Sequence, residues 1–477
     1  MDQAYSIYNP GAIAIRGDRI VAVGKSSVIQ KQYVANKIID AKQQAVMPGL
    51  IDTYSHAGHG MIKAIWHSKR GWPGNPVYFH ATDSDWWYTE GLLSSLERIR
   101  FGVTTGVTII GATPARADSP VFALENARAV NDSGLRGIIG VGPPDPVIKG
   151  VGAEYTTLWE NNRPRIHRYS YEDAMENTRH VIQSVHDPKG SMMQVCLAIP
   201  YLFGRYPRTT RRNEISPHYQ QADRDLIIEK AHAAREFASK EGVLIHTHMF
   251  QSTLDEAVTH YGRDDVLKIM GSDVVIAHGN GLRASEIDLI AKTKAKVVSA
   301  PSMGENVWYG RCPVPELITA GACVAISTDG NAPYVSMDLL AQVYRSLFLN
   351  RLFIGDNDIF LPGKALNMIT KDAATVIGMA DRIGSLEPGK QADLIILDLN
   401  QPHLIPQTHL PQILAFYATG HDVVTTMVNG QILMEDRVVF SLDEEAVKER
   451  ARDEIAKAFR RKNIEDYLEL PDNYWTG

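Results

Sequence analysis

The feature that most constrains the fold is a repeated alternation in the middle of the chain. Between residues 49 and 330, short apolar runs rich in Val, Ile and Leu alternate with longer stretches of helical spacing. Continuous apolar runs are typical of strands that are covered on both faces, as in parallel sheets. Eight strands alternating with helices predict an α/β protein with a (β/α)8 barrel of the TIM type. The eight runs are GLIDTYSH, GVTTGVTII, LRGIIGVG, MMQVCLAIP, GVLIHTH, DVVIAH, AKVVSAP and ACVAISTDG.

The two flanks of this region have a different texture. GAIAI and RGDRIVAVG near the start, and QADLIILDL and VVTTMVNGQILMEDRVV near the end, are short apolar runs separated by Gly, Asp and Asn. We expect one small composite β-sandwich domain assembled from residues 1–47 and 386–440. The barrel is expected over 48–385, and a charged amphipathic helix with a tail over 441–477.

Composition narrows the class of protein. The 477 residues suit one barrel with a smaller companion, and they are 44% hydrophobic and 22% charged. The net charge of −6 does not suggest a nucleic-acid surface, so a small-molecule substrate is expected. The locally basic run at 205–212 is interpreted as a solvated loop, with contact to an anionic ligand as the alternative.

The N-terminal segment, the lengths of the apolar runs and the cysteines indicate where in the cell the protein is expected. The start of the sequence lacks a basic segment followed by an apolar one, and no apolar run approaches the ~18 residues that a membrane span needs. Cys196, Cys312 and Cys323 show no paired or metal-binding spacing, and we expect reduced thiols. These features predict a cytoplasmic protein that does not bind a membrane.

Polar groups end four of the eight runs. The C-terminal ends of barrel strands open onto one face, where the active sites of such barrels lie. Residues two apart on a strand point to the same side, so Tyr54 lies on the same side as His56, and His246 on the same side as His248. Imidazole and carboxylate groups suit zinc and related metals. The groups are Tyr54 and His56, His246 and His248, His278, and Asp329.

Each of these groups has a simpler interpretation when it is taken alone. A single strand histidine is more often a hydrogen-bonded core residue, and the aspartate of Asp329-Gly330 is more often a turn residue. Four such groups at the ends of four strands of one barrel favour a metal site over these alternatives.

The same segments resemble the amidohydrolase superfamily. PGLIDTYSH, the HTH of the fifth run, IAH, ISTDG and IGSLEPGKQADLIILD match the family in order and spacing over nearly the whole chain. Within this superfamily, the sequence is similar in its general pattern of segments to the branch that contains cytosine and guanine deaminases and the triazine hydrolases.

The resemblance implies a role for each matched position. His56 matches the second histidine of the family's strand-one HxH pair, a metal ligand, and His248 matches the strand-five ligand. His278 matches the strand-six histidine that holds the attacking water or, in other members, binds the metal. Asp329 matches the strand-eight aspartate, which binds metal and acts as the general base. Gln251 stands where the family's catalytic acid follows the strand-five ligand.

Two substitutions depart from the family pattern. Tyr54 replaces the first histidine of the HxH pair, and a neutral phenol is a poor ligand. The fourth ligand is therefore left open among Tyr54, His59, His278 and water, and for His59 a loop residue without a metal role is preferred. Gln251 is an amide, which cannot exchange protons at neutral pH as an acid does.

The number of metal ions follows from the fourth run. Members with two metals commonly use a carboxylated lysine at the end of strand four, and residues 192–200 contain no lysine. We expect one divalent transition-metal ion, with zinc preferred over Fe, Mn, Co or Ni.

The predicted function is metal-dependent hydrolysis of the C–N bond of an amide, urea or carbamate by a metal-activated water. Asp329, His278 and Gln251 are the candidate catalytic residues, and His56, His248, Asp329 and Tyr54 the candidate metal ligands. The resemblance extends to phenylurea hydrolases and molinate hydrolase, which also lack the first histidine, and it implies a homo-oligomer. The sequence leaves open a deaminase or dechlorinase of a nitrogen heterocycle, and a catalytically inactive ligand-binding barrel.

Overall fold

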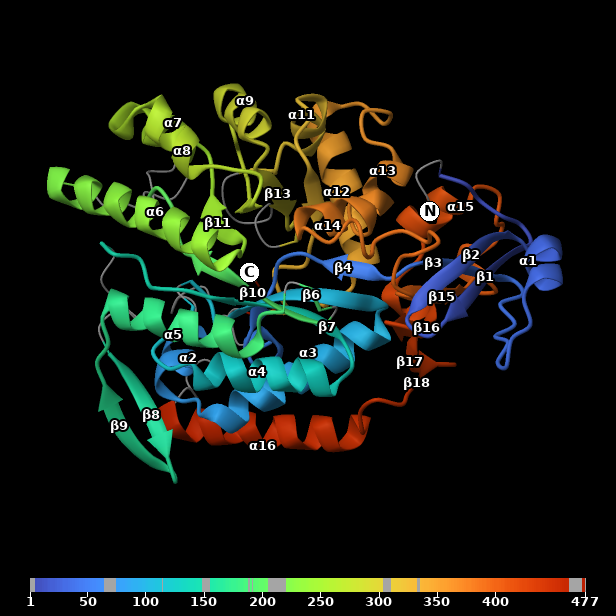
Figure 1. The fold of residues 1–477 in the computed structure, drawn as a ribbon, viewed down its shortest axis with the longest axis horizontal. Helices are drawn as coiled ribbons and strands as arrows, with labels where there is room; N and C mark the ends of the chain where they lie inside the picture. The colour runs from blue at the N-terminus through green and yellow to red at the C-terminus, as the bar shows by residue number, and fades with distance from the viewer. Residues whose placement is uncertain are drawn as a thin grey trace.

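The structure is a computed structural model that describes most of the chain (Figure 1). The described residues are 5–63, 74–113, 115–147, 155–187, 189–190, 192–204, 220–302, 310–332, 335–462 and 474–476. The basic run predicted at 205–212 lies outside them. Within the described part, no helix is both long and apolar enough to cross a membrane.

Eight parallel strands form the central sheet, in the order β14-β13-β12-β11-β10-β7-β6-β4. All eight apolar runs of the sequence become strands of this sheet, so the predicted barrel is confirmed. The first run is broken, because β5 (His56–Ala57) continues it as a separate short strand beside β6. The barrel strands are β4 (Leu50–Asp52), β6 (Val103–Ile110), β7 (Arg136–Val141), β10 (Met193–Ile199), β11 (Ile245–Met249), β12 (Val274–His278), β13 (Lys296–Ser299) and β14 (Val324–Ile326).

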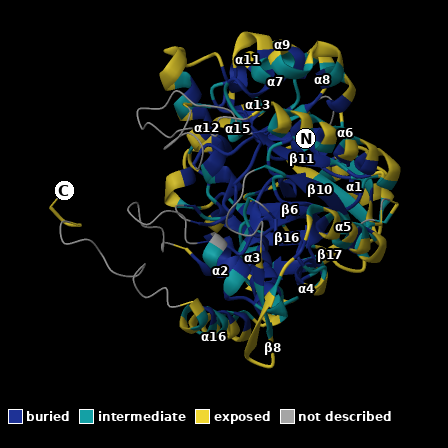
Figure 2. Cartoon of the chain, turned by 90° about the vertical axis from the view of Figure 1, so that its left-hand side faces the viewer, coloured by how far each residue is buried: buried dark blue, intermediate teal, exposed yellow. Residues whose placement is uncertain are grey.

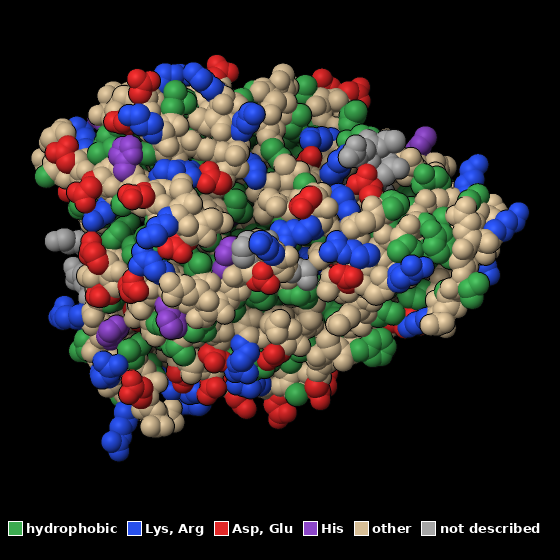
Figure 3. All heavy atoms as spheres, in the orientation of Figure 1, with side chains coloured by type: hydrophobic (Ala, Val, Ile, Leu, Met, Phe, Trp, Pro, Cys, Tyr) green, Lys and Arg blue, Asp and Glu red, His purple; other side chains and the backbone are tan. Residues whose placement is uncertain are grey.

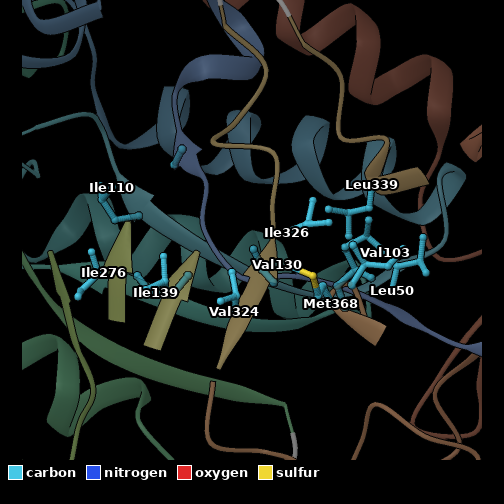
Figure 4. Close-up of a cluster of buried hydrophobic side chains, with 14 of the residues drawn as sticks. Leu50, Val103, Ile110, Val130, Ile139, Ile276, Val324, Ile326, Leu339 and Met368 are labelled. Carbon is cyan, nitrogen blue, oxygen red and sulfur yellow. The ribbon is translucent and has the colours of Figure 1, made fainter. Parts of the chain in front are cut away.

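Alternate residues of the strands bury two separate apolar layers. On β12, Val275 and Ala277 face the barrel interior, whereas Val274 and Ile276 pack toward the surrounding helices. Figure 4 shows part of the outer layer, which gathers side chains from several strands and from α4 and α12. This two-sided burial is the physical reason for the continuous apolar runs in the sequence.

Helices surround the sheet (Figure 1). Several begin at polar residues whose side chains accept a backbone N–H, such as Asp83 for α3 and Asp338 for α12. The longer helices are α3 (Ser84–Arg100), α4 (Val121–Asp132), α5 (Tyr171–Val185), α6 (Gln221–Glu241), α9 (Ala284–Thr293) and α12 (Leu339–Ile354). The shorter ones are α1 (Ser26–Gln32), α2 (Gly74–His80), α7 (Thr253–Tyr261), α8 (Arg263–Ile269), α11 (Val314–Thr319), α13 (Pro362–Asn367) and α14 (Lys371–Val376).

The barrel closes without a backbone ladder between β14 and β4. The backbone at 368–369 lies between the two strands, because Ile326 N–H donates to the Met368 carbonyl (3.0 Å) and Ile51 N–H donates to the Ile369 carbonyl (2.9 Å). At the C-terminal end of this seam the Asp52 carboxylate accepts from the Ser327 hydroxyl, the Thr328 N–H (3.1 Å) and the Thr328 hydroxyl (2.9 Å).

Both chain ends contribute to one antiparallel sheet of five strands, in the order β18-β17-β16-β15-β3. A second ribbon of two strands joins it through backbone bonds between Ile20 and residues 389–390, and the two bury a small core. The predicted composite β-domain is therefore present, at the right of Figure 1, whereas its exact bounds stay a prediction. The strands are β1 (Gly11–Arg16), β2 (Arg19–Lys25), β3 (Gln44–Pro48), β15 (Leu394–Asp398), β16 (Val423–Val428), β17 (Gln431–Glu435) and β18 (Val438–Val439).

Two elements interrupt the predicted pattern. α15 (Leu410–Phe416) lies inside the segment expected to be β-rich and packs against α12 and α13 of the barrel. A hairpin of β8 (Thr156–Glu160) and β9 (Arg163–His167) is inserted between β7 and α5. The expected C-terminal helix forms as α16 (Glu444–Lys462), which packs on α2 and α3 along the lower edge of Figure 1.

Charge is dispersed over the surface. On the face shown in Figure 3, Lys and Arg side chains alternate with Asp and Glu side chains. Inside, two charged pairs connect parts of the fold. Arg136 of β7 donates to both oxygens of Asp393 at 2.9 Å, and this pair joins the barrel to the composite sheet. Arg98 of α3 lies 3.4 Å from Asp52 at the barrel seam.

Replacing Asp52 with asparagine is expected to destabilise the fold strongly. Arg98 and Asp52 are both buried, with side chains 2% and 0% exposed, and the change leaves the guanidinium charge unpaired. Breaking a buried pair in this way costs about 3–5 kcal/mol. Urea unfolding followed by circular dichroism should show a clearly lower midpoint.

The matched control is Asp40→Asn, because Asp40 and Lys42 form an exposed ion pair at 2.9 Å. It should leave the midpoint unchanged. The double variant Asp52→Asn/Arg98→Met removes both charges and should recover part of the loss. A wild-type midpoint for Asp52→Asn alone would contradict the role given to this pair.

Candidate functional site

The backbone links strand one to strand eight where the polar groups lie. β4 ends at Asp52, and the following residues leave the ladder before β5 begins. The Tyr54 N–H donates to the Ser327 hydroxyl (2.8 Å), and the Asp329 N–H donates to the Tyr54 carbonyl (3.0 Å). These bonds hold Tyr54 and Asp329 side by side although they are far apart in the sequence.

The candidate metal ligands converge on the Tyr54 hydroxyl. This oxygen lies 2.7 Å from His56 Nε2 and 2.5 Å from His248 Nε2. Asp329 lies in the same cluster, with its Oδ1 3.4 Å from His56 Nε2. Side chains from strands one, five and eight therefore meet in one cluster.

His278 reaches the same cluster through an unusual backbone conformation. Ala277 faces the barrel interior, so in a regular strand His278 would point outward toward the helices. Its φ of 69° turns the side chain inward, and its Nε2 comes within 3.8 Å of Asp329 Oδ2. Asp329 also has a left-handed φ, 64°. Such strained residues cluster at active sites, because the surrounding structure holds them there for function.

Aromatic rings enclose the cluster. The Tyr54 ring stacks on His246 at 5.3 Å, and His246 Nε2 donates to the Thr53 carbonyl (3.2 Å). Phe250 stacks on His278 at 5.3 Å between centroids, and Tyr201 lies 5.8 Å from His248. His246 is thus a supporting residue deeper in the barrel.

The pKa shifts of His248 and Asp329 favour a neutral imidazole and an ionised carboxylate, the forms that a metal ligand and a general base require. Burial and the charges of His278 and His56 lower the pKa of His248 well below its usual value. Its Nδ1 lies 3.1 Å from the Pro200 carbonyl and donates to it, so Nε2 offers a lone pair to the site. Burial raises the pKa of Asp329, but the charge of His278 and the hydrogen bond and charge of His56 outweigh it, and the net pKa is lowered.

Tyr54 is a neutral phenol in this environment. Burial, followed by the charge of Asp329, raises its pKa well above the usual value. Because the phenol can donate and accept, it satisfies His248 Nε2 and His56 Nε2 at the same time. It therefore occupies the centre of the ligand set in the structure.

His59 lies directly behind His56, and its interpretation as a loop residue without a metal role stays a prediction. It is buried in a short 3-10 turn, η1 (His59–Met61), and its ring centroid is 4.8 Å from that of His56. Burial and the charge of His56 lower its pKa to about 3. Gly330 makes room for it, because a Cβ there would lie 2.6 Å from His59 Nδ1, and its φ of 96° also favours glycine.

Gln251 follows β11 at the start of the loop to α7. Its backbone N–H donates to the Asn280 carbonyl (2.9 Å), and the residue is partly exposed. Among the described hydrogen bonds and ring contacts, none joins its side chain to the cluster around Tyr54. Asp329 is thus the carboxylate that the described contacts bring into the cluster.

The donor set fits a zinc-type ion in chemistry. Two neutral imidazole nitrogens and one carboxylate, from three different strands, are a familiar zinc ligand set. Among the described residues, no three His, Cys, Asp or Glu side chains have the spacing of a metal site as they stand. The Tyr54 hydroxyl lies between the two candidate imidazole ligands, 2.7 Å from His56 Nε2 and 2.5 Å from His248 Nε2.

The sequence was compared with known protein families and curated proteins. Residues 45–433 match the model of the amidohydrolase family, and the chain belongs to this family. A 5'-deoxyadenosine deaminase of Methanobrevibacter smithii is 27% identical over 459 residues, covering 93% of each chain. A 5-methylthioadenosine/S-adenosylhomocysteine deaminase of Desulfitobacterium hafniense is 28% identical over 454 residues, covering 91% of each.

Solved structures show the same fold. An adenosine deaminase from Xanthomonas campestris with bound zinc superimposes with a TM-score of 0.77 at 19% identity, covering 94% of each chain. An atrazine chlorohydrolase from Arthrobacter aurescens with zinc gives a TM-score of 0.69 at 20% identity, covering 93% of this chain and 94% of that one. The protein is a metal-dependent hydrolase of C–N bonds.

Two supporting carboxylates were missed in the sequence. Glu90 of α3 is buried and accepts from Ser94 and Asn126. Glu97, seven residues further along the helix, accepts from the Asn331 amide (2.6 Å) in the loop after β14. The signal was available, because both carboxylates share a helix face with the buried Trp86.

Acid is expected to destabilise the metal-free protein through His246. Burial lowers the pKa of this imidazole from 6.5 to about 4. Below pH 6.5 the unfolded chain therefore takes up a proton that the folded chain does not, and stability falls as the pH drops toward 4. The contribution of this residue is about 2 kcal/mol at pH 5.

The measurement compares urea midpoints at pH 7.5 and pH 5 for the wild type and His246→Gln. Glutamine keeps an N–H donor for the Thr53 carbonyl but does not titrate. The variant should lose less stability in acid, whereas equal losses in the two proteins would refute this effect of His246.

Proposed function

We propose that this enzyme hydrolyses an amide, urea or carbamate, and that it is not primarily a ring deaminase. The observation that carries the proposal is Gln251, which stands where related ring deaminases have an acid to protonate a ring nitrogen. An acyclic carbonyl substrate has no ring nitrogen to protonate. Among the described contacts, Asp329 alone supplies a carboxylate to the cluster.

We propose that His56, His248 and Asp329 hold one zinc ion, with Tyr54, His59, His278 or water as the fourth ligand. When bound, such an ion lowers the pKa of water toward ~7 and polarises a carbonyl. Tyr54 either ligates through its oxygen or moves aside, because its hydroxyl stands at the convergence point. One ion per chain agrees with the lysine-free β10 (Met193–Ile199).

The residues of the chain supply the proton transfers. Asp329, which is kept ionised by His278 and His56, accepts the proton of the attacking water and passes it to the leaving amine. His278 Nε2, 3.8 Å from Asp329, orients the water and stabilises the developing oxyanion. Gln251 contributes at most a hydrogen bond to the substrate.

A small hollow of about 10 Å³, room for about one water molecule, lies beside the site. It shares Pro200 and Tyr201 with the surroundings of His248. The apolar lining is Pro143, Pro144, Pro146, Tyr171, Ile199, Pro200, Tyr201, Leu202, Ile227 and Ala231.

The second candidate is deamination of an adenosine-like nucleoside or dechlorination of a triazine. It is favoured by the names of the relatives, which are deaminases of 5'-deoxyadenosine and of 5-methylthioadenosine or S-adenosylhomocysteine. It requires an acid other than Gln251 to reach the ring.

We also propose a cytoplasmic location. Cys196 and Cys323 form no disulfide, and Cys196 is buried. Burial raises the pKa of Cys196 to about 12 and that of Cys323 to about 11. Unreactive, unpaired cysteines agree with a reducing compartment.

The decisive experiment identifies the products from a substrate panel. Zinc-loaded enzyme is incubated with phenylureas, anilides and carbamates, and in parallel with 5'-deoxyadenosine, 5-methylthioadenosine and atrazine. Mass spectrometry detects organic amines, and separate assays measure ammonia and chloride. We expect an organic amine from the first group, whereas rapid release of ammonia or chloride from the second group would overturn the proposal.

Gln251 variants sharpen this test. Gln251→Ala removes at most one substrate hydrogen bond, worth about 0.5–1.5 kcal/mol, so kcat/KM on the best urea or amide should fall roughly tenfold or less. Gln251→Glu should not improve these substrates. A loss of more than about 1000-fold in Gln251→Ala would assign the amide an essential role and contradict this account.

A further inference from the structure

The outer face of α12 exposes a large apolar patch. Tyr344, Phe348 and Leu352 are spaced four residues apart, so they form one row along the helix, and Phe353 lies on the neighbouring row. Phe353 is 72% exposed and Leu352 67%. Figure 2 shows α12 toward the left-hand edge of the molecule, next to α15.

Neighbouring elements extend this patch. Tyr344 stacks with Phe348 at 6.2 Å and meets Phe416 of α15 edge-on at 6.4 Å. Arg351 binds the Phe360 carbonyl (2.7 Å), which holds the loop after α12 against the helix. The α12 patch is defined as Tyr344, Phe348, Leu352, Phe353, Ile354, Ile359, Leu361 and Tyr417, all of them exposed.

The area of the α12 patch is too large for an ordinary monomer surface. A large side chain presents about 150–250 Å² when fully exposed. At exposed fractions between 38% and 72%, the eight side chains together expose roughly 800 Å². The largest apolar patch of a typical monomer is about 300–600 Å², whereas a stable interface buries about 800 Å² on each partner.

Charges at the rim are arranged for pairing with a second copy. Arg345 lies toward the start of α12, and Asp356 and Asp358 lie just beyond its end. Among the described residues, none of the three side chains has an ion-pair partner. An antiparallel pairing of two α12 helices, centred between residues 350 and 351, sets Arg345 opposite the second copy's 356 position. It also sets Phe348 opposite the second copy's 353 position.

We propose that the α12 patch is the interface of a homodimer with two-fold symmetry. Most homo-oligomers have closed symmetry, and a two-fold interface uses the same patch on both copies. The helix has an apolar row, a cation beside that row in its first half and anions beyond its C-terminal end, so two antiparallel copies place opposite charges next to each other. The proposal does not depend on the reaction, because no residue of the patch belongs to the cluster around Tyr54.

The test is the mass in solution, measured by light scattering and sedimentation on the full chain at micromolar concentration. The wild type should have twice the mass of one chain. Phe353→Glu should weaken the dimer at least 100-fold, and Arg345→Glu about tenfold or more. The double variant Arg345→Glu/Asp356→Arg exchanges the charges and should restore the dimer.

Ile166→Glu is the matched control, because Ile166 on β9 is 68% exposed and lies outside the patch. It should leave the mass unchanged. Circular dichroism checks that each variant folds, as expected for exposed positions. A wild type that stays monomeric, a dimer that survives Phe353→Glu, or a charge exchange that fails to rescue Arg345→Glu would each overturn the proposal.

Discussion

The closure of the barrel at Asp52 is the constraint on which the site depends. β4 and β14 share no backbone ladder, so they are connected through the backbone at 368–369 and through the side chain of Asp52, which has Ser327 and Thr328 on one side and the guanidinium of Arg98 on the other. A buried carboxylate is costly unless all its lone pairs are used. Here they are used to fix the relative position of strands one and eight. Tyr54 and Asp329 lie just beyond this connection, and the hydrogen bond from the Asp329 N–H to the Tyr54 carbonyl keeps them side by side.

The substitution of Tyr54 changes the site more than it changes the fold. Its hydroxyl hydrogen-bonds to His56 and His248 at once, so the Nε2 atoms of both imidazoles are satisfied at the point where they converge. The surrounding backbone keeps its strained conformation at His278 and Asp329. A phenol therefore stands at the centre of the candidate ligand set.

The barrel and most of the candidate site could be predicted from the sequence. Each barrel strand is buried on both faces, so it appears in the sequence as a continuous apolar run. The polar residues at the ends of those runs gave His56, His248, His278 and Asp329 as candidate site residues. Other features depend on tertiary context. A period-two pattern points His278 outward, and only its left-handed φ brings it into the cluster. Short apolar segments do not distinguish strand from helix, so α15 was missed. Gln251 lies in a loop after β11, and the spacing of residues along the sequence does not predict whether its side chain can contact a substrate.

The central claim is that His56, His248 and Asp329 form a single metal site despite Tyr54. Elemental analysis of the purified protein tests it most directly, with Asp329→Asn and the supporting-residue variant His246→Gln measured alongside. The account predicts close to one transition-metal ion per chain in the wild type and in His246→Gln, and a loss of most of it in Asp329→Asn. No bound metal after loading with zinc, two tightly held ions per chain, or full retention in Asp329→Asn would contradict it.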